Sequence, residues 1–255
     1  MTTDFSGAGD PRRSIELLWR VPPLRPRRGP KPRFTVDDVA AAAIALADTE
    51  GLAALSMRRV AERLDVSAMS LYTYVPGKAE LIDLMLDTVY AEVPRSDEDT
   101  ADWRVRLERI ARANWELYLR HPWLLQVATA RPPLGPNLVA KYDDELRAVD
   151  GIGLTDLEMD LVVQMLGDYV HGAARTAVAA TLVAQRTGLT DEQWWSQAGP
   201  VLEKVYEPAR YPTAARVGAA AGVEYNAAVD PARAFEFGLQ RLLDGVEALI
   251  RADPG

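Results

Sequence analysis

The residues with the most definite chemistry lie between Ser56 and Lys78, in the segment SMRRVAERLDVSAMSLYTYVPGK. Its second half combines hydroxyl, small and aromatic side chains. Hydroxyl groups can hydrogen-bond phosphates or base edges, and small side chains let a helix approach a DNA groove closely. Lys78 adds a cation at the start of the next predicted helix, where the helix N-terminus itself attracts anions. The candidate DNA contacts in this segment are Ser67, Ala68, Met69, Ser70, Tyr72, Thr73, Tyr74 and Lys78.

Two short helices joined by a tight turn are needed to present these side chains. We expect Ser56 to cap the first helix, and a break at residues 65–66 to separate it from a second helix over residues 67–74. This is the helix-turn-helix design, in which the second helix enters the major groove. A plain helical hairpin with aromatic residues in its core has the same periodicity, so spacing alone leaves both open. The apolar positions that would hold the two helices at a steep angle are Ala61, Leu64, Val66 and Leu71.

Residues 36–90 closely resemble the DNA-binding domain of TetR-family transcriptional regulators. The similarity is carried by AAAIALADTEGLAALSMRRVAERLDVSAMSLYTYVPGKAELIDLML, which includes the S-M-R-x-V-A-x-x-L second helix and the LYTYVPGKAELI recognition segment. The resemblance implies a three-helix DNA-binding domain at 35–90, followed by a larger ligand-binding and dimerisation domain at 91–255. It implies DNA contact by Arg58, by the residues from Ala68 to Tyr74 named above and by Lys78, with Thr35 as a phosphate contact.

The net charge argues against a nucleic-acid partner, but its distribution does not. The chain carries a formal charge of −8. Residues 1–78 hold twelve basic and nine acidic residues, a net +3, whereas residues 79–255 hold 17 and 28, a net −11. Between residues 20 and 33 there are six basic residues, no acid and five prolines, which forbid a regular helix.

We therefore expect residues 1–34 to form a basic, Pro/Arg-rich N-terminal arm. Arms of this kind can lie in the minor groove of DNA, and a solvated tail is the alternative. The arm residues expected to contact DNA are Arg27, Arg28, Lys31 and Arg33.

Almost every other segment has helical periodicity, and no segment alternates as a strand does, so we predict an all-α fold. Gly51 is expected to end the first of these helices as a left-handed cap. Residues 208–229 are rich in alanine and glycine and are expected to be irregular, with one short helix left open. Three predicted helices begin with capping boxes. These are Thr35 with Asp38, Thr155 with Glu158, and Thr190 with Gln193.

The C-terminal part resembles the regulatory domain of the tetracycline-repressor subgroup. The matching stretches are LRHPWLLQVATARPPLGPN at 119–137 and LGDYVHGAARTAV at 166–178. The resemblance implies a homodimer in which two long helices, near 155–187 and 231–251, pair with their copies in a four-helix bundle. The apolar stripe from Phe235 to Ile250 fits such pairing, although burial within one chain also accounts for it.

One departure from that subgroup concerns its magnesium–drug site. The repressor uses histidine before the Arg-Pro pair, where this chain has Gln126, Val127 and Ala128. We therefore expect no metal, no tetracycline and no cofactor.

Aromatic residues concentrate between residues 103 and 123, and methionine and tyrosine from two other helices can join them. Such walls suit a large, flat or hydrophobic ligand, although ordinary core packing is an equally good account of any single residue. Asp168 and Arg175, with His171 and Thr176, can orient a ligand or be satisfied at a dimer interface. The candidate ligand-binding residues are Met85, Val89, Trp103, Leu107, Trp115, Tyr118, Trp123, Val127, Tyr142, Met165, Asp168, Tyr169 and Arg175.

The composition also bears on catalysis and location. The chain has no cysteine and two histidines, of which His121 is expected at the end of a helix. It has no Glu-x-x-His pair and no nucleophile motif, so we expect no enzyme. No apolar run reaches the roughly 18 residues of a membrane span, and we expect a cytoplasmic protein without a membrane partner.

Together these features predict a dimeric transcriptional regulator. We expect a repressor that binds a pseudo-palindromic operator and is released by a small hydrophobic or aromatic effector. An activator, or a regulator that has lost its ligand, has the same sequence features.

Overall fold

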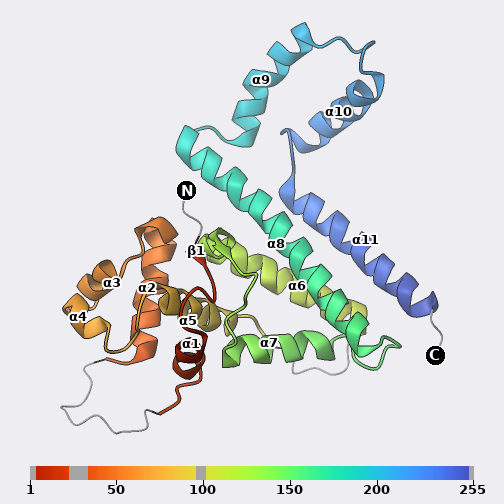
Figure 1. The fold of residues 1–255 in the computed structure, drawn as a ribbon. Coiled ribbons are helices and arrows are strands. Elements are labelled where there is room, and N and C mark those ends of the chain that lie inside the picture. The colour runs from red at the N-terminus through yellow and green to blue at the C-terminus, as the bar shows by residue number, and fades with distance from the viewer. Residues whose placement is uncertain (1–3, 23–33, 96–101, 253–255) are drawn as a thin grey trace.

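The structure is a computed structural model that describes residues 4–22, 34–95 and 102–252. Within these ranges it contains eleven α-helices, two short 3₁₀ turns and two strands of two residues each (Figure 1). The predicted all-α fold is confirmed. The helices are α1 Pro11–Leu18, α2 Val36–Glu50, α3 Met57–Arg63, α4 Ala68–Leu71, α5 Lys78–Tyr90, α6 Trp103–Arg120, α7 Pro136–Arg147, α8 Asp156–Thr187, α9 Asp191–Val205, α10 Pro212–Tyr225 and α11 Pro231–Ala252. The 3₁₀ turns are η1 Leu52–Ala54 and η2 Pro122–Gln126, and the strands are β1 Asp4–Phe5 and β2 Val127–Ala128.

The helix starts follow the local signals in the sequence. All three predicted capping boxes are present, at the beginnings of α2, α8 and α9. Each satisfies backbone N–H groups that the first helical turn leaves unpaired. The cap predicted at Ser56 is also present, since its side chain accepts a hydrogen bond from the Arg59 N–H at 3.3 Å.

Three expectations about local structure are wrong. Gly51 has φ 82° and ψ 162°, which lies outside the left-handed helical region. Residues 212–225 form a helix of 14 residues, because their many alanines favour one. The recognition helix α4 ends at Leu71, and residues 73–74 continue in tighter turns, where the Tyr74 N–H bonds the Leu71 carbonyl at 2.9 Å.

Two apolar cores lie along the chain. The first is built mainly from α2, α3 and α5, but it also takes in Leu117, Trp123 and Val127, which lie beyond residue 90. The second is built from α6, α8 and α11. The two cores meet at Tyr118, which packs against both. The helices that carry the candidate DNA contacts therefore share a core with the segment at 117–127.

Helices α8 and α11 lie side by side over α6 (Figure 1). Their axes approach closely at Gly238, where a Cβ atom would come within 2.8 Å of the Tyr169 ring. The Tyr169 hydroxyl donates to the Phe235 carbonyl at 2.6 Å.

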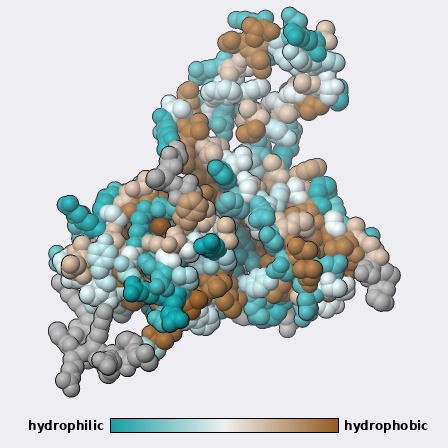
Figure 2. Space-filling model, in the orientation of Figure 1, coloured by the Kyte–Doolittle hydropathy of each residue, from teal (hydrophilic) through white to brown (hydrophobic). Residues whose placement is uncertain are grey.

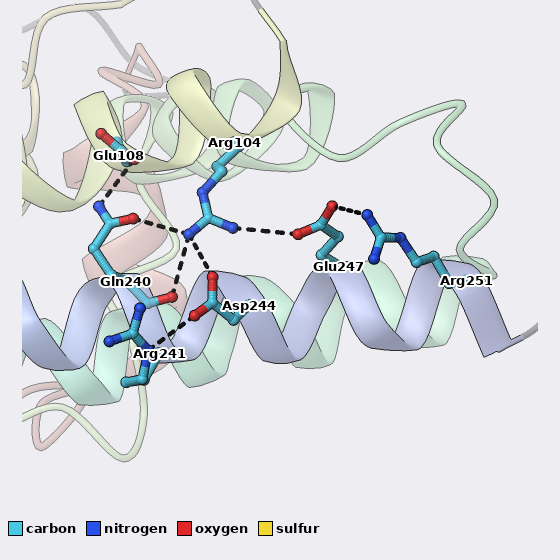
Figure 3. A network of polar contacts seen from close by, with 7 residues as sticks. All are labelled: Arg104, Glu108, Gln240, Arg241, Asp244, Glu247 and Arg251. Carbon is cyan, nitrogen blue, oxygen red and sulfur yellow. Dashed lines mark hydrogen bonds and ion pairs between the residues drawn. The ribbon is translucent and has the colours of Figure 1, made fainter.

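A polar seam fastens α11 to α6 beside this contact (Figure 3). The Arg104 guanidinium lies 2.7 Å from Asp244 Oδ1 and 2.8 Å from Gln240 Oε1, and Gln240 Nε2 donates to Glu108 at 3.0 Å. The hydrogen bond from Arg104 holds the pKa of Asp244 below its usual value. Charged partners of this kind fix the register of two helices.

Helices α9 and α10 form a hairpin that projects away from the helices of the two cores (Figure 1). Neither helix contains a buried residue. Apolar side chains lie at the surface of the hairpin (Figure 2).

The N-terminal arm differs from the prediction over residues 4–18. β1 pairs in parallel with β2, in the register Asp4 with Val127 and Phe5 with Ala128. α1 packs against α5, with Ser14 and Leu18 buried. The prediction failed here because the prolines that forbid a helix begin only at residue 22. Residues 23–33, which hold most of the basic charge, lie outside the described residues.

Candidate DNA-binding and effector sites

The outer face of α4 carries most of the predicted base contacts. Ser67 caps the helix, its side chain accepting from the Ser70 N–H at 3.2 Å, and Leu71 is fully buried beneath it. On the opposite side Met69 is 77% exposed and Tyr72 is 48% exposed. Ser70 and Thr73 are exposed as well, and Ala68 is half-buried at the edge of this face.

Tyr74 lies elsewhere. Its ring packs against the first core, with its centroid 4.2 Å from that of Phe34. The aromatic side chain is therefore part of the support beneath α4 rather than of its outer face. Ala61 is buried, and Leu64 and Val66 pack against the same core, as the helix-turn-helix prediction requires.

The other predicted DNA contacts that the structure describes, Arg58, Thr35 and Lys78, each have an intramolecular partner. Arg58 is exposed on α3 and pairs with Glu62 at 2.8 Å. The Thr35 backbone N–H and hydroxyl both bond Asp38, which lowers the pKa of that carboxyl. Lys78 begins α5 and pairs with Asp4 Oδ2 at 3.1 Å. The arm residues Arg27, Arg28, Lys31 and Arg33 lie outside the described residues.

The candidate ligand-binding residues fall into three groups. Met85, Val89, Trp123 and Val127 are buried in the first core. Leu107 and Trp115 are buried in the second, with Trp103 and Tyr169 packed against it. Tyr142, Met165, Asp168 and Arg175 are exposed on α7 and α8. The structure brings the first two groups together only at their boundary, around Tyr118.

An aromatic stack fills the second core beside that boundary. The Trp115 and Phe235 rings are stacked with centroids 4.3 Å apart, and Tyr169 lies on the same Phe235 ring at 6.0 Å. Phe235 was recognised only as part of an apolar stripe, because its partner rings lie more than 60 residues away in sequence. Tyr118 contacts His171 edge-on at 5.5 Å. Burial raises the pKa of Tyr118 to about 12 and, with Arg175 nearby, lowers that of His171.

A small recess with charged residues at its rim lies between α5, α6 and α7. Lys141 and Glu145 form a largely buried ion pair, and Asn114 Nδ2 donates to Glu145 at 3.1 Å. These residues were missed, although a lysine and a glutamate four apart on α7 are a signal for such a pair. The recess is lined by Tyr90, Val93, Arg95, Ile110, Lys141, Asp144 and Glu145.

His121 joins the two parts of the chain. As predicted, it ends a helix, and it caps α6. Its buried ring contacts Asp48 at 2.7 Å through Nδ1 and Glu92 at 3.1 Å through Nε2. The Trp123 indole N–H also donates to Asp48, at 2.7 Å. Since Asp48 is on α2 and Glu92 follows α5, these bonds tie the end of α6 to the helix-turn-helix region.

The described residues offer neither a metal-binding cluster nor a membrane-spanning helix. No cluster of three or more histidine, aspartate or glutamate side chains among them could hold a metal ion. None of the helices in those ranges is long and apolar enough to cross a bilayer.

The fold and the outer face of α4 define a helical regulator with a helix-turn-helix reader, and sequence comparison agrees. Residues 34–85 match the family model described as bacterial regulatory proteins, tetR family. Residues 94–250 match the model described as tetracyclin repressor-like, C-terminal domain. The chain belongs to the TetR family, and it is a DNA-binding transcriptional repressor rather than an enzyme.

Individual relatives cover nearly the whole chain. The HTH-type transcriptional repressor DrrR1 of Streptomyces coeruleorubidus is 46% identical over 98% of this chain and 90% of its own length. The class E tetracycline repressor of Escherichia coli is 22% identical over 86% of this chain and 93% of its own length. The crystal structure of ActR from Streptomyces coelicolor with actinorhodin has a TM-score of 0.71 and 28% identity, covering 85% of this chain and 96% of ActR.

Proposed function

We propose that the chain acts as a homodimer whose two α4 helices contact the half-sites of a pseudo-palindromic operator. A small hydrophobic or aromatic effector, bound by the C-terminal helices, releases it. The observation that carries the DNA-binding half of this proposal is the outer face of α4. Met69 and Tyr72 are exposed on a helix whose other side is anchored by the fully buried Leu71. Such a helix presents side chains to a major groove without losing its support.

The proposed base contacts are Ala68, Met69, Ser70, Tyr72 and Thr73. Hydroxyl groups can bond base edges or phosphates, and Met69 can make apolar contact with a thymine methyl group. Arg58, Lys78 and Thr35 are the proposed phosphate contacts, joined by Arg27, Arg28, Lys31 and Arg33 of the arm. Tyr74 is proposed to act through its packing beneath the helix.

The proposed dimer interface is the outer surface of α8 and α11. Leu157, Leu161 and Met165 recur every fourth residue along α8 and all three are exposed. Phe237 is exposed on α11, which packs beside α8. A four-helix bundle with a second copy would bury exposed apolar side chains of this kind on two adjacent helices.

The proposed effector site lies around Tyr118, between the two cores. The neighbouring walls are Trp115, Phe235 and Tyr169 on one side and the recess at Lys141 and Glu145 on the other. Aromatic walls with a few polar groups suit a flat, partly polar ligand. The complex of ActR with actinorhodin supports a ligand-responsive role for this chain. Release requires only that the effector bind more tightly to a conformation in which the spacing of the two α4 helices does not match the operator half-sites.

A mobility-shift titration tests the DNA-binding half. We expect the full chain to retard a duplex taken from the DNA upstream of its own gene. Met69→Ala should weaken this binding about five- to tenfold, because it removes an apolar contact in the groove. Val105→Ala, an equally simple truncation of an exposed side chain on α6, should leave it unchanged. Equal affinities for the two variants would contradict the assignment of α4 as the reader.

A further inference from the structure

Lys78 has an unusual partner for a phosphate contact. Its ammonium group lies 3.1 Å from Asp4 Oδ2, and both side chains are only partly exposed, at 37% and 26%. Asp4 comes from the extreme N-terminal part of the described chain, 74 residues away. A carboxylate at this distance from a lysine occupies the place that a DNA phosphate would take.

The position of Asp4 is set by the C-terminal part of the molecule. Asp4 stands opposite Val127 in the β1–β2 pair. The next residue but one, Ser6, donates from its backbone N–H to the Ala128 carbonyl at 3.0 Å and from its hydroxyl to the Arg131 carbonyl at 2.5 Å. Asp4 is therefore held beside Lys78 by the segment at 127–131.

Residues 7–19 are also held by hydrogen bonds to distant parts of the chain. The Gly7 N–H and the Ser14 hydroxyl both donate to the buried carboxylate of Asp83, at 2.9 and 3.0 Å. The Trp19 indole N–H donates to the Leu134 carbonyl at 2.8 Å. Residues 4–19 thus form a strap that touches α5 on one side and the segment at 127–134 on the other.

We propose that Asp4 is an intramolecular competitor of the operator phosphate at Lys78, and that the segment at 127–131 sets its position. This inference rests on the proposed role of Lys78 in DNA binding. When the chain binds DNA, Lys78 exchanges a carboxylate for a phosphate, and the Asp4 charge remains close to the backbone of the DNA. A shift of β2 carries Asp4 with it, so the C-terminal helices have a direct path to a phosphate-binding lysine.

The substitution Asp4→Asn tests the competition. In a titration with DNA from upstream of the gene, we expect Asp4→Asn to bind about two- to fivefold more tightly, the range expected for a partly exposed ion pair. The slope of log affinity against log salt should steepen by up to about one per protomer, because the wild-type Asp4 charge beside the DNA offsets one of the phosphate-neutralising cations. A merely structural role of Asp4 would not steepen this slope.

Glu16→Gln is the matched control. It changes the charge equally on the same strap, from an exposed position on α1. We expect it to shift affinity less than Asp4→Asn. If both variants gained affinity equally, the cause would be the lost negative charge alone and not the pair with Lys78. That result would overturn the proposal. Weaker binding by Asp4→Asn together with a lower melting temperature would overturn it as well, by assigning Asp4 to the support of the fold.

A double-mutant cycle with Lys78 completes the test. In a Lys78→Gln background, Asp4→Asn should no longer raise the affinity, because the competing pair is absent. An undiminished gain would contradict the proposal. If the wild-type chain bound no upstream fragment, that result would contradict the proposed operator. It would differ from every result that contradicts the role of Asp4, because those results compare variants that bind.

Discussion

At the scale of single residues, three acids on α5 are unexpected. Glu80, Asp83 and Asp87 are buried on a helix whose other inward positions are apolar. Asp83 bonds the strap through Gly7 and Ser14, and Asp87 accepts from the N–H groups of Asn137 and Leu138 at 3.1 and 2.9 Å. Because each of these two carboxylates satisfies backbone groups of a distant segment, α5 organises both the N-terminal strap and the start of α7.

The first prediction concerns the pH dependence of Asp83. Burial raises its pKa, and the hydrogen bonds from Gly7 and Ser14 oppose this only in part. Because the pKa of Asp83 is higher in the folded chain than in the unfolded chain, the folded chain binds more protons at pH values between the two. The wild type should therefore lose stability relative to Asp83→Asn as the pH rises from about 4 through the raised pKa.

Urea unfolding of both chains between about pH 4 and 7 measures this difference. Asp38→Asn is the control of opposite sign, because Thr35 lowers the pKa of Asp38. There the wild type should lose its advantage as the pH falls. A wild type that keeps or gains stability relative to Asp83→Asn as the pH rises would contradict the prediction.

At the scale of elements, the contact between α8 and α11 is a close approach of two long helices. Tyr169 is held over Gly238 by its bond to the Phe235 carbonyl and by stacking on the Phe235 ring. A Cβ at position 238 would overlap the Tyr169 hydroxyl and lie 2.8 Å from its ring carbons. The ring can move only by giving up both contacts.

The second prediction follows from this contact. Gly238→Ala should be about 1–3 kcal/mol less stable than Gly245→Ala, the usual cost of overpacking. Gly245 lies on the same helix with open space around its Cβ position. Both changes gain the same helix propensity, of about 1 kcal/mol, so their difference isolates the clash. Chemical unfolding measures it, and equal stabilities would mean that Tyr169 moves aside freely.

At the scale of the whole molecule, large apolar side chains lie exposed on α8 and on the α9–α10 hairpin. Leu157, Leu161 and Met165 face outward on α8, and Trp194 and Val223 do so on the hairpin. Monomeric proteins rarely leave so many large apolar side chains in water. A homodimer would cover them.

The third prediction tests this dimer. Leu161→Glu should raise the dimer dissociation constant at least about tenfold, because burying an unpaired carboxylate is costly. Sedimentation equilibrium measures the change. Val105→Glu adds the same charge at a comparably exposed site on α6 and should leave the dimer intact. Equal dissociation constants for the two variants would place the interface elsewhere.

The fourth prediction separates the basic stretch of the arm, residues 20–33, from the strap, which is the packed part of the arm. Because residues 4–18 are packed, a deletion of the whole N-terminus would disturb α5 as well as remove charge. Changing Arg27, Arg28, Lys31 and Arg33 to glutamine removes only the charge. Operator binding should weaken, and its salt slope should fall by about 0.9 for each phosphate that the arm no longer neutralises. An unchanged slope would make the arm a passive tail.

Features that depend on near neighbours in the chain could be predicted from the sequence. Helix starts were predicted at Thr35, Ser56, Thr155 and Thr190, because a cap and the N–H that it satisfies are three residues apart. The helix-turn-helix was predictable for the same reason, since Ala61 and Leu71 lie within one short segment. The proline-rich stretch argued against a helix over residues 22–32 but said nothing of residues 4–18.

The contacts between distant segments could be seen only in the folded chain. Asp4 and Val127 are strand partners, the Asp83 carboxylate bonds Gly7, and Phe235 stacks between Trp115 and Tyr169. Each of these contacts joins residues more than 60 positions apart. Their geometry follows from how whole helices pack, because burial and close approach are properties of the assembled core and not of any local pattern. The ion pair of Asp4 with Lys78 is also a contact between distant segments, so the sequence could not predict it.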